Sequence, residues 1–124
     1  MLLVGGIDEI IDYKSQFKTN IYKNMAKYII NVTFCVEQPY VEAWKNWLIN
    51  SFLPSIDGSF HHAKTMRVMT HVEPGINNFS VQHEVDDFHA LTLWKQNHEE
   101  QMKTDLFKQF GQHVLTFTTF LELL

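Results

Sequence analysis

Seven histidines among 124 residues are the first candidates for chemistry, because imidazole binds metal ions and transfers protons near neutral pH. A zinc site needs ligands that converge, for example from positions i and i+4 of a helix. No two histidines have that spacing or the i,i+2 spacing of a strand. His61 and His62 are adjacent, and His89 and His98 would point to opposite sides of a helix. We therefore predict no metal site.

Arginine and cysteine each occur once. Arg67 could hold a carboxylate through two parallel hydrogen bonds, although a cross-strand pair with Glu84 or Gln82 explains it as well. Cys35 has no basic neighbour on its predicted strand, which favours an unreactive thiol, and a single cysteine excludes an internal disulfide. The chain also lacks a glycine-rich phosphate loop and a nucleophile elbow, so no cofactor is predicted.

The composition is that of a globular chain with enough apolar mass for a packed core. Hydrophobic residues make up 45% of it and aromatic residues 14%. Its 14 acidic and 10 basic residues give a net charge of -4, which argues against binding to nucleic-acid phosphates. No apolar run approaches the ~18 residues that a membrane span needs. We expect a cytoplasmic protein without a nucleic-acid or membrane partner.

Residues 1–24 differ from the rest and are interpreted as an extension. Their charges cancel, and Ile7, Ile10 and Ile11 have the spacing of a short amphipathic helix. A predicted strand follows Met25 almost at once. We therefore favour Met25 as the translation start over an N-terminal arm that packs on the domain or on a partner. The single predicted domain covers residues 25–124.

Glycine, proline and apolar periodicity delimit six elements in this domain, because apolar residues alternate in strands and recur every three or four positions in helices. The expected elements are a strand over 28–36, a helix over 39–53, a strand over 60–71, a strand over 79–85, a helix from Asp86 or Asp87 to Phe110, and a strand over 114–124. Pro54 would end or kink the first helix, and Gly111 would end the second. The polar stretch near Asn97 could break that second helix.

This order, βαββαβ, predicts the ferredoxin-like arrangement of the α+β class. Right-handed crossovers place both helices on one face of a four-stranded antiparallel sheet. The other face of the sheet stays open, and alternate strand residues line it.

The candidate ligand-binding residues are Arg67, Gln82, Asn31 and His83. A hairpin centred between residues 74 and 75 would place Arg67 opposite Gln82 on the open face, and Asn31 would join them from the first strand. In this register His83 belongs to the helix-facing set. A hairpin shifted by one residue would move Arg67 to the helix side instead.

Apolar residues accompany this polar group. The residues that could share the open face are Ile29, Met69, Leu115, Phe117, Leu121 and Leu123. An exposed apolar area of this size usually has a partner, and the most economical partner is a second copy of the chain. We expect a homodimer through the open sheet face, with a wet cavity or a hydrogen-bonded seam between the two polar centres.

Several short segments carry a family resemblance. They are YIINVTFCVE, Trp44-Lys45-Asn46-Trp47, the segment from Met66 to Gly75, Phe79-Ser80-Val81-Gln82 and Phe120-Leu121-Glu122-Leu123. Residues 25–124 resemble a family of short bacterial domains of unknown function. The resemblance implies a ferredoxin-like α+β fold akin to dimeric α+β barrels, and it supplies no activity, substrate or catalytic residue. Residues 1–24 lie outside it.

Two functions fit these observations. The first is a non-enzymatic homodimeric domain that binds a small ligand or another protein. The second, based on fold analogy alone, is a cofactor-independent oxygenase or isomerase of the dimeric α+β barrel type. An enzyme would have a deep cavity in each protomer lined by convergent polar groups. An assembly module would have a filled core and would place its open face in the dimer contact.

Overall fold

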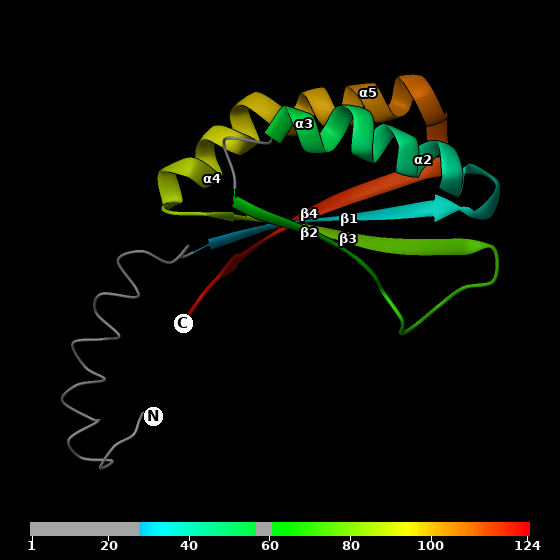
Figure 1. Ribbon diagram of the computed structural model, residues 1–124, viewed down its shortest axis with the longest axis horizontal. Coiled ribbons are helices and arrows are strands. Elements are labelled where there is room, and N and C mark those ends of the chain that lie inside the picture. Colours follow the sequence, from blue (N-terminus) through cyan, green and yellow to red (C-terminus); the bar gives the residue numbers. More distant parts are fainter. Residues whose placement is uncertain (1–27, 57–60) are drawn as a thin grey trace, which may run out of the picture.

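The computed structural model describes residues 28–56 and 61–124, which form a sheet with helices on one face (Figure 1). The strands are β1 (Tyr28–Glu37), β2 (His61–Arg67), β3 (Ile76–Val85) and β4 (Val114–Glu122). The helices are α2 (Val41–Trp47), α3 (Leu53–Ile56), α4 (Phe88–Trp94) and α5 (Glu100–Phe110). The predicted extension over residues 1–24 and the predicted turn at residues 57–58 lie outside the described residues.

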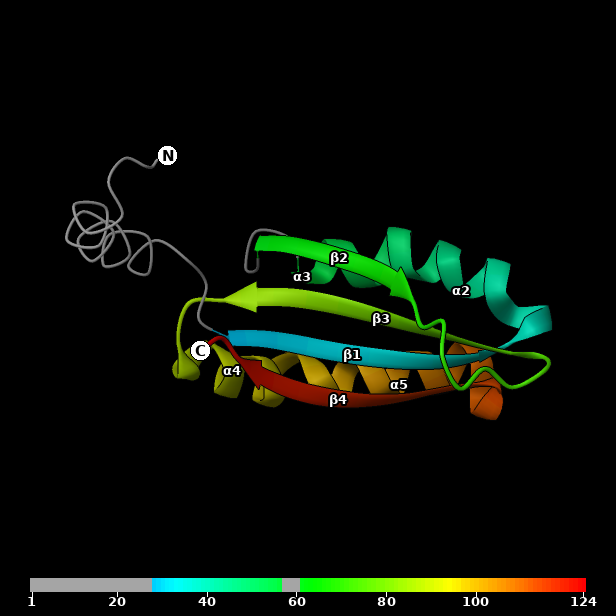
Figure 2. The ribbon, with the colours of Figure 1, turned by 90° about the horizontal axis from the view of Figure 1, so that it is seen from below.

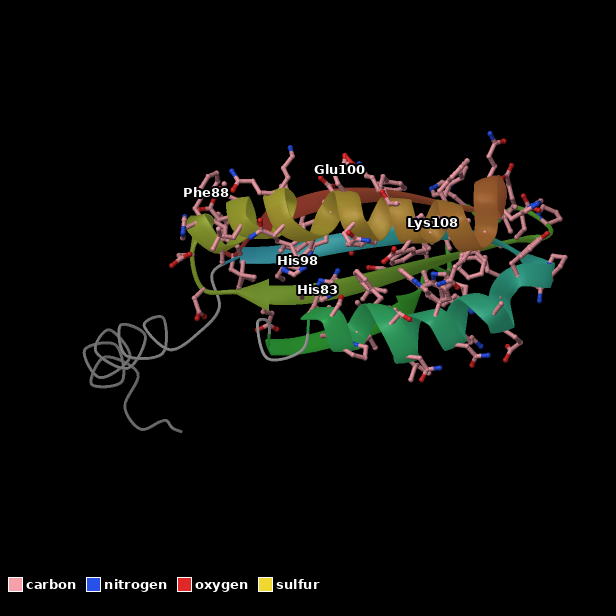
Figure 3. All side chains as sticks on the ribbon, turned by 90° about the horizontal axis from the view of Figure 1, so that it is seen from above. His83, Phe88, His98, Glu100 and Lys108 are labelled. Atoms are coloured by element: carbon pink, nitrogen blue, oxygen red, sulfur yellow. The ribbon has the colours of Figure 1, made fainter. Side chains whose placement is uncertain are left out.

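The four strands pair antiparallel in the order β2-β3-β1-β4. Figure 2 shows β1 and β3 in the middle of the sheet and β2 and β4 at its edges. Helices α2 and α3 lie over the β2–β3 half, and α4 and α5 lie over the β1–β4 half (Figures 2 and 3). This arrangement confirms the predicted ferredoxin-like α+β fold.

The helices form two continuous helical stretches side by side on the sheet, which we call the two helical layers. Each has a π-helical segment in its middle. Residues 48–52 join α2 to α3, and residues 95–99 join α4 to α5. Pro54 was expected to end or kink the helix near Leu53; the helix does not end there, because Pro54 lies inside α3. Proline costs little there, since it is the second residue after a π-helical segment that already interrupts the regular hydrogen-bond ladder. The polar stretch near Asn97 widens the helix locally and does not break it.

The boundaries of the second helical stretch follow the sequence signals closely. Of the two candidate caps, Asp87 is the one used, and its carboxylate accepts a hydrogen bond from the Ala90 backbone N–H at 2.9 Å. Gly111 ends α5 with a φ of 58°, a conformation that favours glycine.

Alternate residues of the two central strands fill the space beneath the helices. The sheet contributes Ile30, Val32, Phe34, Val36, Phe79, Val81 and Val85, and the helices contribute Trp44, Trp47, Leu48, Phe52, Leu91, Trp94, Met102, Leu106 and Phe110. The Phe34 ring lies 5.2, 5.8 and 5.7 Å from the rings of Trp44, Trp47 and Phe52. Phe34 therefore lies at the centre of an aromatic cluster in the interior.

The register between β2 and β3 differs from the prediction. Arg67 pairs with Phe79 rather than with Gln82, three positions away. The connection between β2 and β3 covers residues 68–75 and is longer than a tight turn. Within it His71 adopts a φ of 54°, and the Gly75 carbonyl accepts a hydrogen bond from the Gln38 N–H at 2.8 Å. A shift by an odd number of residues exchanges the two faces of a strand. The predicted place of Arg67 on the open face is therefore wrong.

In the described part of the chain, no helix is long and apolar enough to cross a membrane. The cytoplasmic location stays a prediction.

Candidate functional site

The four predicted ligand-binding residues lie in three separate places. Asn31 and Gln82 are direct cross-strand partners on the open face of the sheet, as expected. Arg67 lies on the helix side of the edge strand β2, and His83 is buried under the helices. The structure therefore does not unite them in one pocket, and ligand binding by each of them stays a prediction.

Arg67 joins the edge strand to the start of the first helical layer. Its guanidinium carbon lies 4.9 Å from the centre of the Phe79 ring, and its Nη1 donates a hydrogen bond to Asn77 Oδ1. Asn77 Nδ2 in turn donates to Gln38 Oε1 at 2.6 Å. The expected cross-strand pair with Glu84 or Gln82 does not form, because Arg67 lies on the helix side of the sheet and both of these residues lie on the open face. These contacts support a structural role for Arg67.

His83 projects from β3 into the space between the sheet and the helices (Figure 3). Its side chain is fully buried, and its ring centre lies 5.5 Å from that of Phe52. Burial lowers its pKa to about 4, and a backbone hydrogen bond with Ile30 opposes this shift. The imidazole is therefore neutral near pH 7.

A small hydrogen-bonded group occupies the centre of the open face. The Ser80 hydroxyl donates to Asn31 Oδ1, and Asn31 Nδ2 donates to the Thr33 hydroxyl at 3.3 Å. Thr33 and Ser80 are themselves direct cross-strand partners. The Asn31 amide thus uses both its ends inside one protomer, which lowers the cost of removing it from water.

Exposed apolar side chains flank this polar centre. The β4 residues Leu115, Phe117 and Leu121 are 60%, 56% and 40% exposed, and they pair with open-face residues of β1. Met66 projects from β2 on the far side of the same face. We call these four residues the apolar rim. Ile29 also lies on this face, as expected, whereas Met69 and Leu123 lie beyond the ends of their strands.

Cys35 lies on the open face between Leu115 of β4 and Asn78 of β3. Burial and, to a smaller extent, the negative charge of Glu73 raise the pKa of its thiol. A raised pKa leaves less of the reactive thiolate, which agrees with the predicted unreactive thiol.

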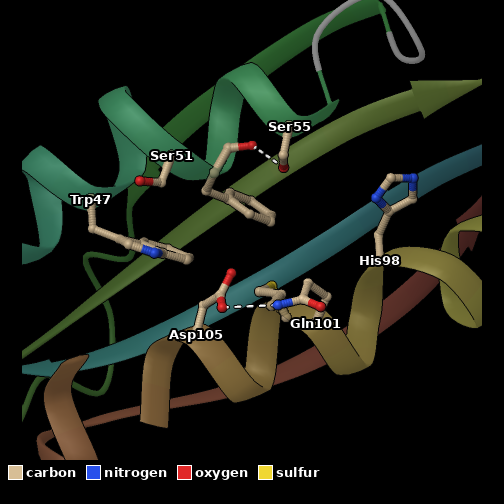
Figure 4. A pocket seen from close by; sticks show the side chains of 8 residues that line it. Trp47, Ser51, Ser55, His98, Gln101 and Asp105 are labelled. Carbon is tan, nitrogen blue, oxygen red and sulfur yellow. Dashed lines mark hydrogen bonds between the residues drawn. The ribbon is translucent and has the colours of Figure 1, made fainter. Parts of the chain in front are cut away.

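Sequence analysis missed a groove between the two helical layers. It has a volume of about 70 Å³ and is lined by Trp47, Ser51, Phe52, Ser55, His98, Gln101, Met102 and Asp105 (Figure 4). The signal was present as polar residues four positions apart on each helical stretch, at 51 and 55 and at 101 and 105. Across the described ranges, no group of three or more His, Cys, Asp or Glu residues could hold a metal ion.

Residues 25–124 match the model of a family described as a domain of unknown function, DUF4286. The chain belongs to the DUF4286 family. This match confirms the predicted family resemblance and covers the whole predicted domain. Among curated proteins, none matches the chain by sequence.

Three solved structures share the fold of this DUF4286 domain at low sequence identity. A dimeric ferredoxin-like protein from an uncultured marine organism is 11% identical, with a TM-score of 0.56, over 80% of this chain and 96% of that one. A Bacillus cereus protein named as an antibiotic biosynthesis monooxygenase is 12% identical, with a TM-score of 0.54, over 79% and 93% of the two chains. An ethyl tert-butyl ether D (EthD) family protein from Bacillus halodurans is 17% identical, with a TM-score of 0.51, over 77% and 99%. These likenesses show the fold alone.

Proposed function

We propose that this DUF4286 domain works as a homodimer whose two open sheet faces pack against each other, and that it is a non-enzymatic binding or assembly module. The observation that carries the proposal is the apolar rim. Three of its residues project from one edge strand and the fourth from the opposite side of the same face. Apolar residues grouped in this way on a folded domain mark an interaction surface.

The polar centre of the open face is suited to burial in such a contact. Unpaired polar groups are costly to remove from water, but Asn31, Thr33 and Ser80 already satisfy one another within the protomer. Gln82 lies next to Asn31 and can donate and accept hydrogen bonds across the interface. A two-fold axis near Asn31 would bring the two polar centres together as a seam and leave the apolar rims around it.

The comparison with solved structures gives this proposal additional support. One similar protein is named as a dimeric ferredoxin-like protein, so the fold is compatible with dimer formation.

The alternative function, a cofactor-independent enzyme, has weaker support. Pockets that bind drug-sized molecules have volumes of roughly 300–1,000 Å³, whereas the helix groove has about 70 Å³. The polar residues considered for this chemistry also lie in three separate places. The Bacillus cereus protein with a monooxygenase name shares the fold at 12% identity, which is too little to transfer a reaction.

Two matched phenylalanines allow a direct test of the dimer face. Phe117 is 56% exposed on the open face, and Phe107 is 66% exposed on the helix side, in α5. We expect sedimentation velocity of the full chain to give a dimer. Phe117→Glu should give a folded monomer at the same concentration, because it would bury two negative charges at the interface. Phe107→Glu should remain a dimer.

Other results would overturn the proposal. A monomeric wild-type chain would remove the dimer altogether. A dimer that survives Phe117→Glu but dissociates with Phe107→Glu would assign the contact to the helical layer. Circular dichroism of each variant separates loss of the dimer from loss of the fold.

A further inference from the structure

The loop between β2 and β3 extends on the side of the sheet that the helices leave open. It covers residues 68–75, and in Figure 1 its trace swings away from the helices. The negative charge of Glu73 acts on the thiol of Cys35, which lies on the open face, so the loop passes near that face. The loop is therefore in a position to contact whatever covers the open face.

Backbone hydrogen bonds hold this loop at both ends. At its start the Val68 N–H donates to the Asn78 carbonyl at 2.9 Å, and at its end the Gly75 carbonyl accepts from the segment that follows β1. Between these ends, Met69 and Val72 are 76% and 60% exposed. Apolar side chains on a loop with fixed ends contribute to binding at a low cost in conformational entropy.

The strand registers arrange the open face in rows that run across the four strands. One row contains Lys64, Gln82, Asn31 and Thr119, the next contains Met66, Ser80, Thr33 and Phe117, and a third contains Asn78, Cys35 and Leu115. The loop begins beside the third row, because Val68 is bonded to Asn78. Each row therefore runs from the β2 edge to the β4 edge.

Two sheets that pack face to face around a two-fold axis between them have two limiting arrangements. An axis perpendicular to the strands places each strand over the same strand of the partner. The two β2 strands would then face each other, and the two Lys64 ammonium groups would share one contact, which is unfavourable. An axis parallel to the strands, between β1 and β3, places β2 over β4 of the partner instead.

We propose that the dimer uses the parallel axis and that the loop over residues 68–75 clasps β4 of the partner. The inference rests on the proposed function and deepens it, because it states which elements of the two copies meet. Met66 then faces the partner's Phe117 in the same row, and Met69 and Val72 of the loop pack on the partner's Leu115.

The polar and charged residues also fit this arrangement. Gln82 faces the partner's Asn31, so the two polar centres meet in one row. Lys64 lies over the partner's Thr119 at the edge of the contact, where a lysine side chain extends to water. From Val114 to Leu121 the partner's β4 has no charged residue, which suits an apolar clasp.

Cross-linking between two cysteine variants tests the axis. Both full-length chains carry Cys35→Ser, because Cys35 is the only native cysteine. A chain with Met66→Cys is mixed with a ¹⁵N-labelled chain with Phe117→Cys, and after subunit exchange a bismaleimide with a two-carbon spacer is added. We expect the adduct between the two chains to be the main product in the intact mass spectrum.

Two further mixtures are the matched controls. Met66→Cys with Leu121→Cys should give little adduct, because Leu121 lies two rows away from Phe117 on the same strand. Leu115→Cys with Leu121→Cys should also give little adduct. On a perpendicular axis this last pair would react, whereas Met66 and the partner's Phe117 would lie three strands apart, which is about 14 Å.

Substitutions in the loop test the clasp. We expect Met69→Glu and Val72→Glu each to raise the dissociation constant of the dimer at least tenfold in sedimentation velocity, because an apolar contact becomes a buried charge. Ile49→Glu is the control, since Ile49 is 61% exposed on the helix side. Circular dichroism checks that each variant is folded.

The results distinguish failure of the inference from failure of the proposed function. A monomeric wild-type chain overturns both. A dimer that dissociates with Phe117→Glu but gives no adduct between Met66→Cys and Phe117→Cys keeps the face-to-face dimer and overturns the parallel axis. If that adduct forms and both folded loop variants dimerise as tightly as the wild type, the loop is not a clasp.

Discussion

At the scale of single residues, the burial of His83 makes the free energy of unfolding depend on pH. Its pKa is lowered from 6.5 to about 4 in the folded protein. Between these two pH values the unfolded chain binds a proton that the folded chain does not. The contribution of His83 to the free energy of unfolding is therefore complete above pH 6.5. It falls by about 3 kcal/mol as the pH decreases to about 4.

We expect this loss to disappear in His83→Leu. Urea unfolding at pH 7.5 and pH 4.5 should show a smaller decrease in the free energy of unfolding for this variant than for the wild type. His89→Leu, at an exposed position of α4, should behave as the wild type does. Equal pH dependence of the wild type and His83→Leu would show that folding does not lower the pKa of His83.

The polar residues of the open face illustrate what a sequence predicts at this scale. Strand alternation, with the apolar side of each strand turned toward the helices, places Asn31 and Gln82 on the open face, and the structure pairs them directly. The prediction for Arg67 was wrong, because the face of the sheet on which Arg67 lies depends on the loop before β3. That loop is held by the hydrogen bond between Gln38 and Gly75, residues far apart in the sequence. A contact of this kind leaves no local signal.

At the scale of elements, the cap of α4 offers a matched pair of neighbouring acids. Asp87 accepts a hydrogen bond from the Ala90 N–H, whereas Asp86 is exposed and precedes the cap position. We expect Asp87→Ala to lower the free energy of unfolding by about 1 kcal/mol. Asp86→Ala should change it by only a few tenths. Chemical unfolding of both variants measures this, and an equal or larger loss for Asp86→Ala would contradict the assignment.

The elements themselves were largely predictable, because apolar periodicity, proline and glycine are local signals. The strand register and the helix groove were not. Pro54 lies inside a helix because a π-helical segment precedes it, and no residue type announces that segment. The groove depends on how the two helical layers sit across the sheet, which brings Trp47 and Asp105 to facing walls only in the folded domain.

At the scale of the whole molecule, the domain has two surfaces with different chemistry. The open sheet face carries the apolar rim around a polar centre that is already hydrogen-bonded. The helix side carries the groove. A dimer through the first surface covers half-buried Cys35 and leaves the second surface free, so each protomer keeps its own groove.

Intermolecular contacts in solution test the central claim, the face-to-face dimer, most directly. The measurement is an isotope-filtered NOE experiment on a dimer mixed from ¹³C-labelled and unlabelled chains. We predict NOEs between protomers from the methyl groups of Leu115, Leu121 and Met66 on the open face. NOEs between protomers from Ile49 or Leu93 on the helical layer, or none at all, would contradict the account.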